Sequence, residues 1–525
     1  MLFTSYGFIA FIAILFVVYY IVPKKWQWPL LLMASGVFYW IADPRYLIFI
    51  FVTSLSAWGC GVLMARINDG QALYLKEHAD TVTKDEKKAL KAKNKKRKWH
   101  ILLACLILNI GILAVTKYTD FVIDNINNAF HSGLHKVDLI IPMGISFYTF
   151  QTMSYIIDAY RGTVTPERNP FKLALFTSFF PQLVQGPINR YGDLSKTLYE
   201  PHRFSEKVFS MGLMRILWGY FKKVVVADRI ITVVTMLVSD TDTYTGAYVF
   251  VAMFFYAFEL YCDFTGGIDI TIGIAQALGI TMKENFNLPY FSKDIKEYWN
   301  RWHISMGSWF TDYIFYPLSV SPRMLKLSKW SREHLGKVIG KRVTVYLAAF
   351  IVWFTTGLWH GAAWNFIVWG LMNFVVIMIS QELAPLYSKF HKKFGFKGKS
   401  WYTVFEIIRT IFLMSLIRMF DCYRNVPMTF KMVGTMFTRF RLKIFTDGSL
   451  LKLGLTKYDY IVLAVALIVI LSVSIFKYNR GEVRTKLYEK PWLWYGAMSA
   501  LFIVIIVFGA YGIGYDSTQF IYNQF

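Results

Sequence analysis

The chain has 525 residues, of which 55% are hydrophobic, 18% are aromatic and only 17% are charged. Soluble domains carry about a quarter charged residues, so this composition excludes an ordinary soluble globular protein. A helix needs roughly 20 mainly apolar residues to cross a bilayer, and stretches of that kind recur along the chain. We therefore expect an all-α, multi-pass protein of the cytoplasmic membrane, with about eleven to twelve transmembrane helices and additional re-entrant or interfacial helices.

The apolar stretches divide the whole of residues 1–525, which we expect to form one transmembrane domain. Some stretches are short, as in tilted or re-entrant helices. In chain order they are Tyr6–Val22, Trp28–Trp40, Tyr46–Met64, His100–Val115, Leu139–Ile157, Leu213–Val238, Ala247–Cys262, Val343–Leu358, Ala362–Ile379, Val404–Met419, Tyr460–Phe476 and Trp492–Gly512.

Basic residues gather between these stretches and give a net charge of +24, from 57 basic and 33 acidic residues. Such clusters mark cytoplasmic loops, so residues 65–99, which contain the lysine-rich run Lys84–Lys98, are predicted to be a cytoplasmic loop. Anionic membrane lipid or an anionic cytosolic substrate fits this charge, whereas nucleic acid does not. The four cysteines lack the spacing of metal ligands, and no metal is expected.

The strongest candidate for chemistry is His360, in a segment (residues 343–380) where apolar helices flank it on both sides. Gly357 and Gly361 permit close backbone approach, and Trp359 and Trp364 are expected to wall off a cavity. A desolvated imidazole is neutral, as a general base must be to accept a proton. The alternative is a structural histidine hydrogen-bonded between helices, and spacing alone does not decide between the two.

A second candidate is His303, in the polar but aromatic-rich segment 283–342, which we predict to be interfacial or re-entrant. Asn300 and Arg301 lie directly before it. The cations near His303 suggest the entrance for a phosphate-bearing donor. An interfacial anchor with no role in chemistry is the equally weighted alternative.

Acidic residues occur along Phe258–Ile274, where Glu259 and Asp263 lie four apart and share a face of a helix. Paired carboxylates could perform acid–base chemistry, but inside a membrane they more often anchor polar networks between helices. The sequence contains no HExxH, P-loop or GxSxG motif, which argues against a zinc protease, an ATPase and a serine hydrolase.

Two segments, YWNRWHISMGSWFTDYIFYPL (residues 298–318) and GLWHGAAWNFIVWG (residues 357–370), resemble the signature segments of membrane-bound O-acyltransferases. Further pieces resemble the bacterial alginate O-acetyltransferase branch, among them IPMGISFYTFQTMSYIIDAYRG (residues 141–162), FFPQLVQGPINRY (residues 179–191) and the ending FIYNQF. Together they cover most of the chain in the expected order. The resemblance implies helices arranged around a central tunnel.

The resemblance also implies that His360 and His303 are the catalytic pair, with Trp359, Trp364, Asn365, Arg301 and Asn300 near the tunnel. His360 then takes a proton from an acceptor hydroxyl, and Asn365 or Trp364 stabilises the tetrahedral intermediate. No resident cofactor is expected, and acetyl-CoA is the expected acyl donor. The expected acceptor is an extracytoplasmic polysaccharide or cell-wall polymer, reached through an expected partner acetyltransferase that resembles SGNH hydrolases.

Two other functions remain compatible with the sequence. The first is D-alanyl transfer to teichoic acid from an acyl carrier protein, within the same superfamily. The second is transport or flipping of a polymer or lipid, which would need no chemistry at His360.

Overall fold

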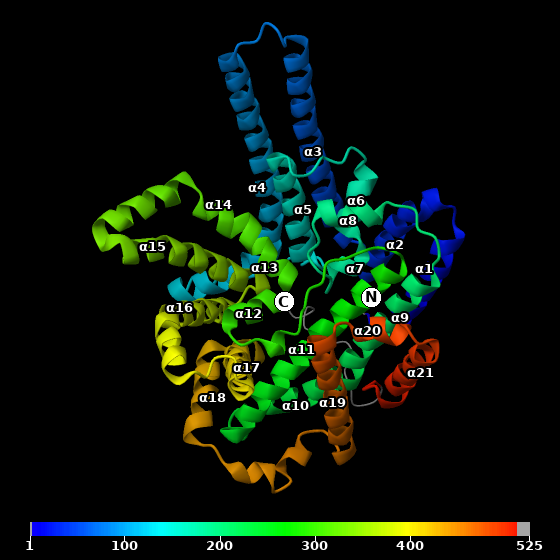
Figure 1. Ribbon diagram of the computed structural model, residues 1–525, viewed down its shortest axis with the longest axis vertical. Coiled ribbons are helices and arrows are strands. Elements are labelled where there is room, and N and C mark those ends of the chain that lie inside the picture. Colours follow the sequence, from blue (N-terminus) through cyan, green and yellow to red (C-terminus); the bar gives the residue numbers. More distant parts are fainter. Residues whose placement is uncertain (1–2, 512–525) are drawn as a thin grey trace. The chain divides into compact units, whose positions relative to one another are not determined.

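The computed structural model describes residues 3–511, which form helices connected by turns and contain no strand (Figure 1). This confirms the all-α prediction. Contacts within the chain group it into two compact units. The first comprises residues 1–212 and 274–283, and the second comprises residues 213–273 and 284–525.

The first unit contains the N-terminal helices. They are α1 (Tyr6–Ile21), η1 (Lys24–Trp26), α2 (Gln27–Ala42), α3 (Tyr46–Glu77), α4 (Lys84–Phe130), α5 (Ile145–Arg161), α6 (Pro170–Ser178), α7 (Phe180–Leu183) and α8 (Tyr191–Leu198). Helices α9 (Glu206–Tyr220) and α11 (Ala247–Ala277) are divided between the units.

The second unit contains the remaining helices. They are η2 (Phe221–Ala227), α10 (Asp228–Ser239), η3 (Pro289–Phe291), α12 (Ile295–Arg301), α13 (Ile304–Phe310), η4 (Thr311–Phe315), α14 (Tyr316–Ser319), α15 (Pro322–His360), α16 (Trp364–Phe394), α17 (Ser400–Tyr423), α18 (Val426–Thr438), η5 (Leu442–Phe445), η6 (Ser449–Lys452), α19 (Lys457–Arg480), α20 (Val483–Tyr488) and α21 (Pro491–Phe508).

Seven helices of the described chain are long and apolar enough to cross a membrane, fewer than the eleven to twelve expected: α3, α4, α11, α15, α16, α19 and α21. Helix α1 is apolar but has only 16 residues. The predicted span Leu213–Val238 is interrupted by the π-helical segment η2, which carries the buried charges Lys222 and Lys223. The span predicted from Leu139 starts only at Ile145, after Gly144 in the left-handed conformation (φ 73°).

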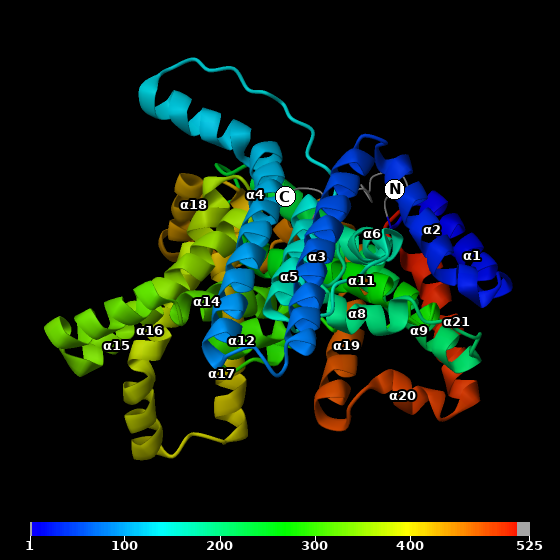
Figure 2. The same ribbon diagram turned by 90° about the horizontal axis from the view of Figure 1, so that it is seen from above.

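The lysine-rich run predicted as a loop is helical instead. Helices α3 and α4 form a long antiparallel pair that projects from the rest of the first unit, and only the segment 78–83 connects them (Figures 1 and 2). Thr83 and Glu86 form a capping box that starts α4. The Asn94 side chain donates to Gln71 at 3.1 Å across the pair. Lysine is a good helix former, and a hydrophobicity pattern does not reveal this tendency.

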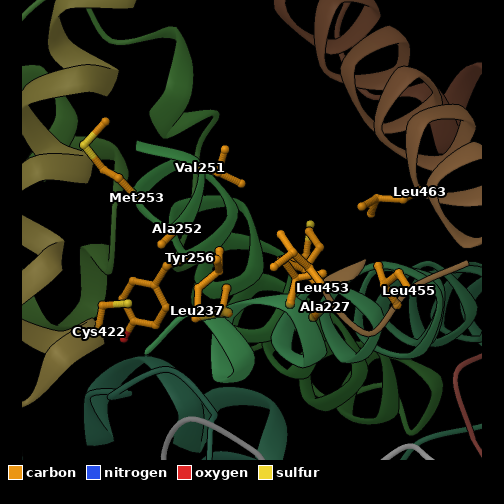
Figure 3. Close-up of a cluster of buried hydrophobic side chains, with 14 of the residues drawn as sticks. Ala227, Leu237, Val251, Ala252, Met253, Tyr256, Cys422, Leu453, Leu455 and Leu463 are labelled. Carbon is orange, nitrogen blue, oxygen red and sulfur yellow. The ribbon is translucent and has the colours of Figure 1, made fainter. Parts of the chain in front are cut away.

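The core of the second unit is an apolar cluster contributed by α10, α11, α17 and α19 (Figure 3). Leu237, Val251, Cys422 and Leu463 represent these four helices, and each is at least nine-tenths buried. Because α17 is fixed against this core, its last residues also have fixed positions beside α16.

Buried charges in the second unit form ion pairs. Lys223 lies 2.7 Å from Asp228 and 2.6 Å from Asp263, and Lys222 lies 2.7 Å from Asp269. A buried charge is tolerated when it is paired. The interpretation of Asp263 as a member of a polar network is therefore confirmed, and Asp269 on the same helix is paired in the same way.

Candidate active site

His360 is the last residue of α15 and lies where this helix turns into α16. The two helices run side by side (Figure 1). A Cβ atom on Gly357 would lie 2.5 Å from the carbonyl oxygen of Phe366, and one on Gly361 would overlap the Phe366 ring. This confirms that the two glycines permit close approach, which holds His360 against α16.

The ring of His360 packs against two tryptophans. The ring centre of Trp359 lies 5.0 Å from that of His360, and the ring centre of Trp369 lies 4.8 Å away, both at steep angles. His360 is 9% exposed, and both tryptophans are buried. Trp364, expected to wall off a cavity, has a side chain that is 57% exposed at the start of α16. Trp369, one turn and a half further along α16, is the tryptophan against His360.

His303 lies at the junction of α12 and α13 and is 1% exposed. The segment before α12 pairs with this junction, because Asn287 N donates to Arg301 O and Ile304 N donates to Asn285 O, both at 2.9 Å. His303 adopts the left-handed conformation, with φ 49° and ψ 51°. A non-glycine residue there costs of order 1–3 kcal/mol, and it persists where the surrounding structure enforces it.

The hydrogen bonds of His303 define its protonation state. Asn285 Oδ1 accepts from the Ser305 backbone N at 3.0 Å and from the Ser305 hydroxyl at 2.8 Å. That oxygen lies 3.3 Å from His303 Nδ1, so Nδ1 carries the proton and donates. Burial, together with the nearby Arg418 cation, lowers the pKa of His303 to about 3. The imidazole is therefore neutral, and its Nε2 presents a lone pair.

Trp359 connects the two histidines. Its ring centre lies 6.1 Å from that of His303 and 5.0 Å from that of His360, within one unit of the structure. Residues nearly 60 positions apart in the sequence thus line one aromatic cluster.

The remaining predicted residues make other contacts. Asn365 is buried and donates its amide to the backbone oxygen of Phe420 at 3.3 Å, so it holds α17 against α16. Arg301 pairs with Glu297 at 2.6 Å within α12. Asn300 is exposed.

Sequence reasoning missed Arg418, which lies inside the predicted span Val404–Met419. Its guanidinium carbon lies 4.9 Å from the ring centre of Trp302 and 5.1 Å from that of Trp369. An ionisable residue in an apolar span is itself a signal of function. Both tryptophans are distant from Arg418 in the sequence, so the sequence alone did not connect it to either histidine.

Comparison with known proteins gives the family. The profile of the membrane-bound O-acyltransferase family matches residues 166–420. The chain is 32% identical to "Probable alginate O-acetylase AlgI" of Pseudomonas syringae pv. tomato, over 73% of this chain and 67% of that protein.

Two further relatives carry different names. The chain is 30% identical to the peptidoglycan O-acetyltransferase of Helicobacter pylori, over 60% of each chain. It is 28% identical to the teichoic acid D-alanyltransferase of Bacillus subtilis, over 52% of this chain and 66% of that protein. On the profile match and the alginate O-acetylase relatives, this chain is an acyltransferase that belongs to the membrane-bound O-acyltransferase family.

Proposed function

We propose that this protein transfers an acetyl group from a cytosolic donor, acetyl-CoA, to a hydroxyl of an extracytoplasmic polysaccharide or cell-wall polymer. The observation that carries the proposal is the pair of buried histidines, His303 and His360, joined through Trp359. The names of the alginate and peptidoglycan relatives support acetyl as the group transferred and a polymer as the acceptor.

In the proposed reaction, His360 is the general base. The acceptor oxygen forms a bond to the carbonyl carbon of the thioester while His360 takes the hydroxyl proton. The carbon–sulfur bond then breaks, and the thiol leaves with that proton. A positioned base contributes about 10²–10⁴-fold to such a step. Trp359 and Trp369 exclude water from His360, which limits hydrolysis of the donor.

His303 has the donor-side role in this proposal. Its Nε2 makes no hydrogen bond to any residue between 3 and 511, while Nδ1 is held by Asn285. A buried lone pair of this kind can accept an amide N–H, which the pantetheine arm of coenzyme A supplies. His303 would thereby orient the thioester in front of His360.

The proposed setting is the cytoplasmic membrane, with the donor entering from the cytosol. The partner we propose is an extracytoplasmic acetyltransferase resembling SGNH hydrolases, which would pass the acetyl group to the polymer. Membership of an acyltransferase family favours this reaction over the transporter or flippase interpretation. D-alanyl transfer from a carrier protein stays a second candidate because of the similarity to the Bacillus protein.

The test uses inside-out membrane vesicles that contain the protein. Labelled acetyl-CoA or D-alanyl carrier protein is added outside the vesicles, and base-labile label on the polymer is measured. Transfer from acetyl-CoA that is lost in His360→Ala supports the proposal. If label is transferred only from the D-alanyl carrier protein, the proposed reaction is D-alanylation instead of acetylation. If His360→Ala labels the polymer as strongly as the wild type does, His360 is not the base.

A further inference from the structure

One cation within the aromatic cluster has no part in the reaction described above. Arg418 lies on α17, and its side chain is 7% exposed. Its guanidinium contacts the ring of Trp302, which precedes His303, and the ring of Trp369, which packs on His360. Arg418 therefore adjoins a tryptophan neighbour of each histidine.

The hydrogen-bonding capacity of Arg418 is only partly used. Nη1 donates to Asp421 Oδ2 at 3.2 Å. Nε and Nη2 are buried and make no hydrogen bond to another residue of the described chain, although the Tyr298 hydroxyl lies nearby, outside hydrogen-bond geometry. A buried charged donor without an acceptor is costly, so these two N–H groups call for an acceptor that residues 3–511 do not supply.

The groups around the Arg418 guanidinium indicate which kind of acceptor it binds. Indole rings contact the guanidinium by cation–π interaction and hold it in place. The Nε and Nη2 groups form one edge of the planar fork, which binds anionic oxygen. In acyl transfer, the negative charge that develops at the reacting centre is on the former carbonyl oxygen of the donor.

We propose that Arg418 binds the carbonyl oxygen of the acyl donor through Nε and Nη2 and stabilises the negative charge that develops on it. This rests on the proposed function, since it assigns the oxyanion of that same reaction. When the acceptor oxygen attacks, the C=O electron pair moves to the oxygen held by Arg418, and the hydroxyl proton goes to His360. The pair returns to re-form C=O as the carbon–sulfur bond breaks.

A purely structural role would have Arg418 brace α17 against α12 and α16. Such a brace needs the ring contacts, with the Asp421 pair on the same helix orienting the guanidinium, and it makes no use of Nε and Nη2. The two roles therefore predict different results for Arg418→Lys, which keeps the cation, and for Asp421→Asn, which removes only the ion pair.

The experiment measures acetyl transfer in inside-out vesicles at saturating acetyl-CoA, and acetyl-CoA binding to the purified full-length protein. We expect Arg418→Gln to lower the turnover rate by about 10²–10³-fold, as loss of an oxyanion donor does elsewhere, with little change in acetyl-CoA affinity. Arg418→Lys keeps the charge without the fork, so its loss is expected to be smaller. Asp421→Asn is expected to remain far more active than Arg418→Gln.

Arg409→Gln is the matched control on the same helix, where Nη2 donates to the backbone oxygen of Lys293 at 2.7 Å. It should behave like the wild type in turnover. The proposal is overturned if Arg418→Gln turns over at nearly the wild-type rate. It is also overturned if Arg418→Gln loses only acetyl-CoA affinity, because that result would indicate that Arg418 binds the donor phosphates. If neither Arg418 variant is recovered folded, or Asp421→Asn loses as much turnover as Arg418→Gln, the residue is a brace and the proposal is rejected.

The two proposals fail in different ways. If the wild type transfers no acetyl group from acetyl-CoA, the proposed function fails whatever Arg418 does. If the wild type is active, His360→Ala is inactive and the Arg418 variants are active, the function stands and this assignment falls.

Discussion

Asn285 and His303 are joined by a hydrogen bond of 3.3 Å between Oδ1 and Nδ1, and this contact determines which imidazole nitrogen carries the proton. Ser305 donates to the same Oδ1 twice, so the amide cannot turn without losing two hydrogen bonds. The neutral tautomer with its lone pair on Nε2 follows from these three residues.

The free energy of unfolding is expected to fall in acid, because the His303 imidazole is buried in its neutral form. Its pKa is about 3 in the folded protein and 6.5 when solvated. Between these values the unfolded chain binds the extra proton, so stability is full above pH 6.5 and declines below it, by at most about 1.4 kcal/mol per pH unit. Thermal unfolding of the purified protein from pH 4 to 8 measures this decline. In His303→Gln the decline should be smaller, and an equal slope in both proteins would contradict the assignment.

His360→Ala is expected to abolish acyl transfer while the protein remains folded. The loss of a general base lowers turnover by about 10²–10⁴-fold. The measurement is base-labile acetyl on the isolated cell-surface polymer, with the amount of membrane protein determined in parallel. Normal acetylation of the polymer in a strain that expresses His360→Ala well would reject His360 as the general base.

His303→Ala is expected to weaken donor binding, whereas His360→Ala should leave it largely intact. His303 Nε2 is the buried acceptor proposed for the donor, and His360 is proposed to act only on the acceptor proton. Titration of both purified variants with acetyl-CoA separates the roles. Unchanged binding in His303→Ala, or lost binding in His360→Ala, would reverse the assignment.

A methyl group added at Gly357, in the contact between α15 and α16, is expected to destabilise the protein. In Gly357→Ala the new Cβ would meet the Phe366 carbonyl at 2.5 Å, and backbone cannot move aside cheaply. We expect a loss of about 1–3 kcal/mol in stability and a marked loss of turnover. Gly434→Ala is the control, because no heavy atom lies within 4 Å of its added Cβ and alanine favours a helix. Equal melting temperatures for the two variants would contradict the packing argument.

The lysine-rich start of α4 is expected to face the cytosol and to be dispensable for chemistry. Lysine clusters remain on the cytoplasmic side, and Ala92 is exposed there. A cysteine at Ala92 should react with a membrane-impermeant reagent in inside-out vesicles and not in intact cells. Replacement of Lys87, Lys91 and Lys95 by glutamine should leave turnover near wild type, and loss of turnover would assign the pair α3–α4 a functional role.

The sequence by itself determined the fold class, because apolar stretches long enough to cross a bilayer as helices recur along the chain. It also selected His303 and His360 as candidate site residues, since the segments around both carry the family resemblance. Gly357 and Gly361 could be assigned to close packing because only a missing Cβ permits that approach.

The tertiary structure decided what surrounds these residues. Trp369 rather than Trp364 packs on His360, although Trp364 is nearer to it in the sequence. The way α16 packs beside α15 leaves Trp364 exposed and buries Trp369 against the imidazole. Arg418 reached the cluster through the packing of α17 against α16, a contact between distant segments. A local pattern carries the tendency to form a helix, but contacts between distant segments depend on how complete helices pack, and these contacts determine which side chains share the site.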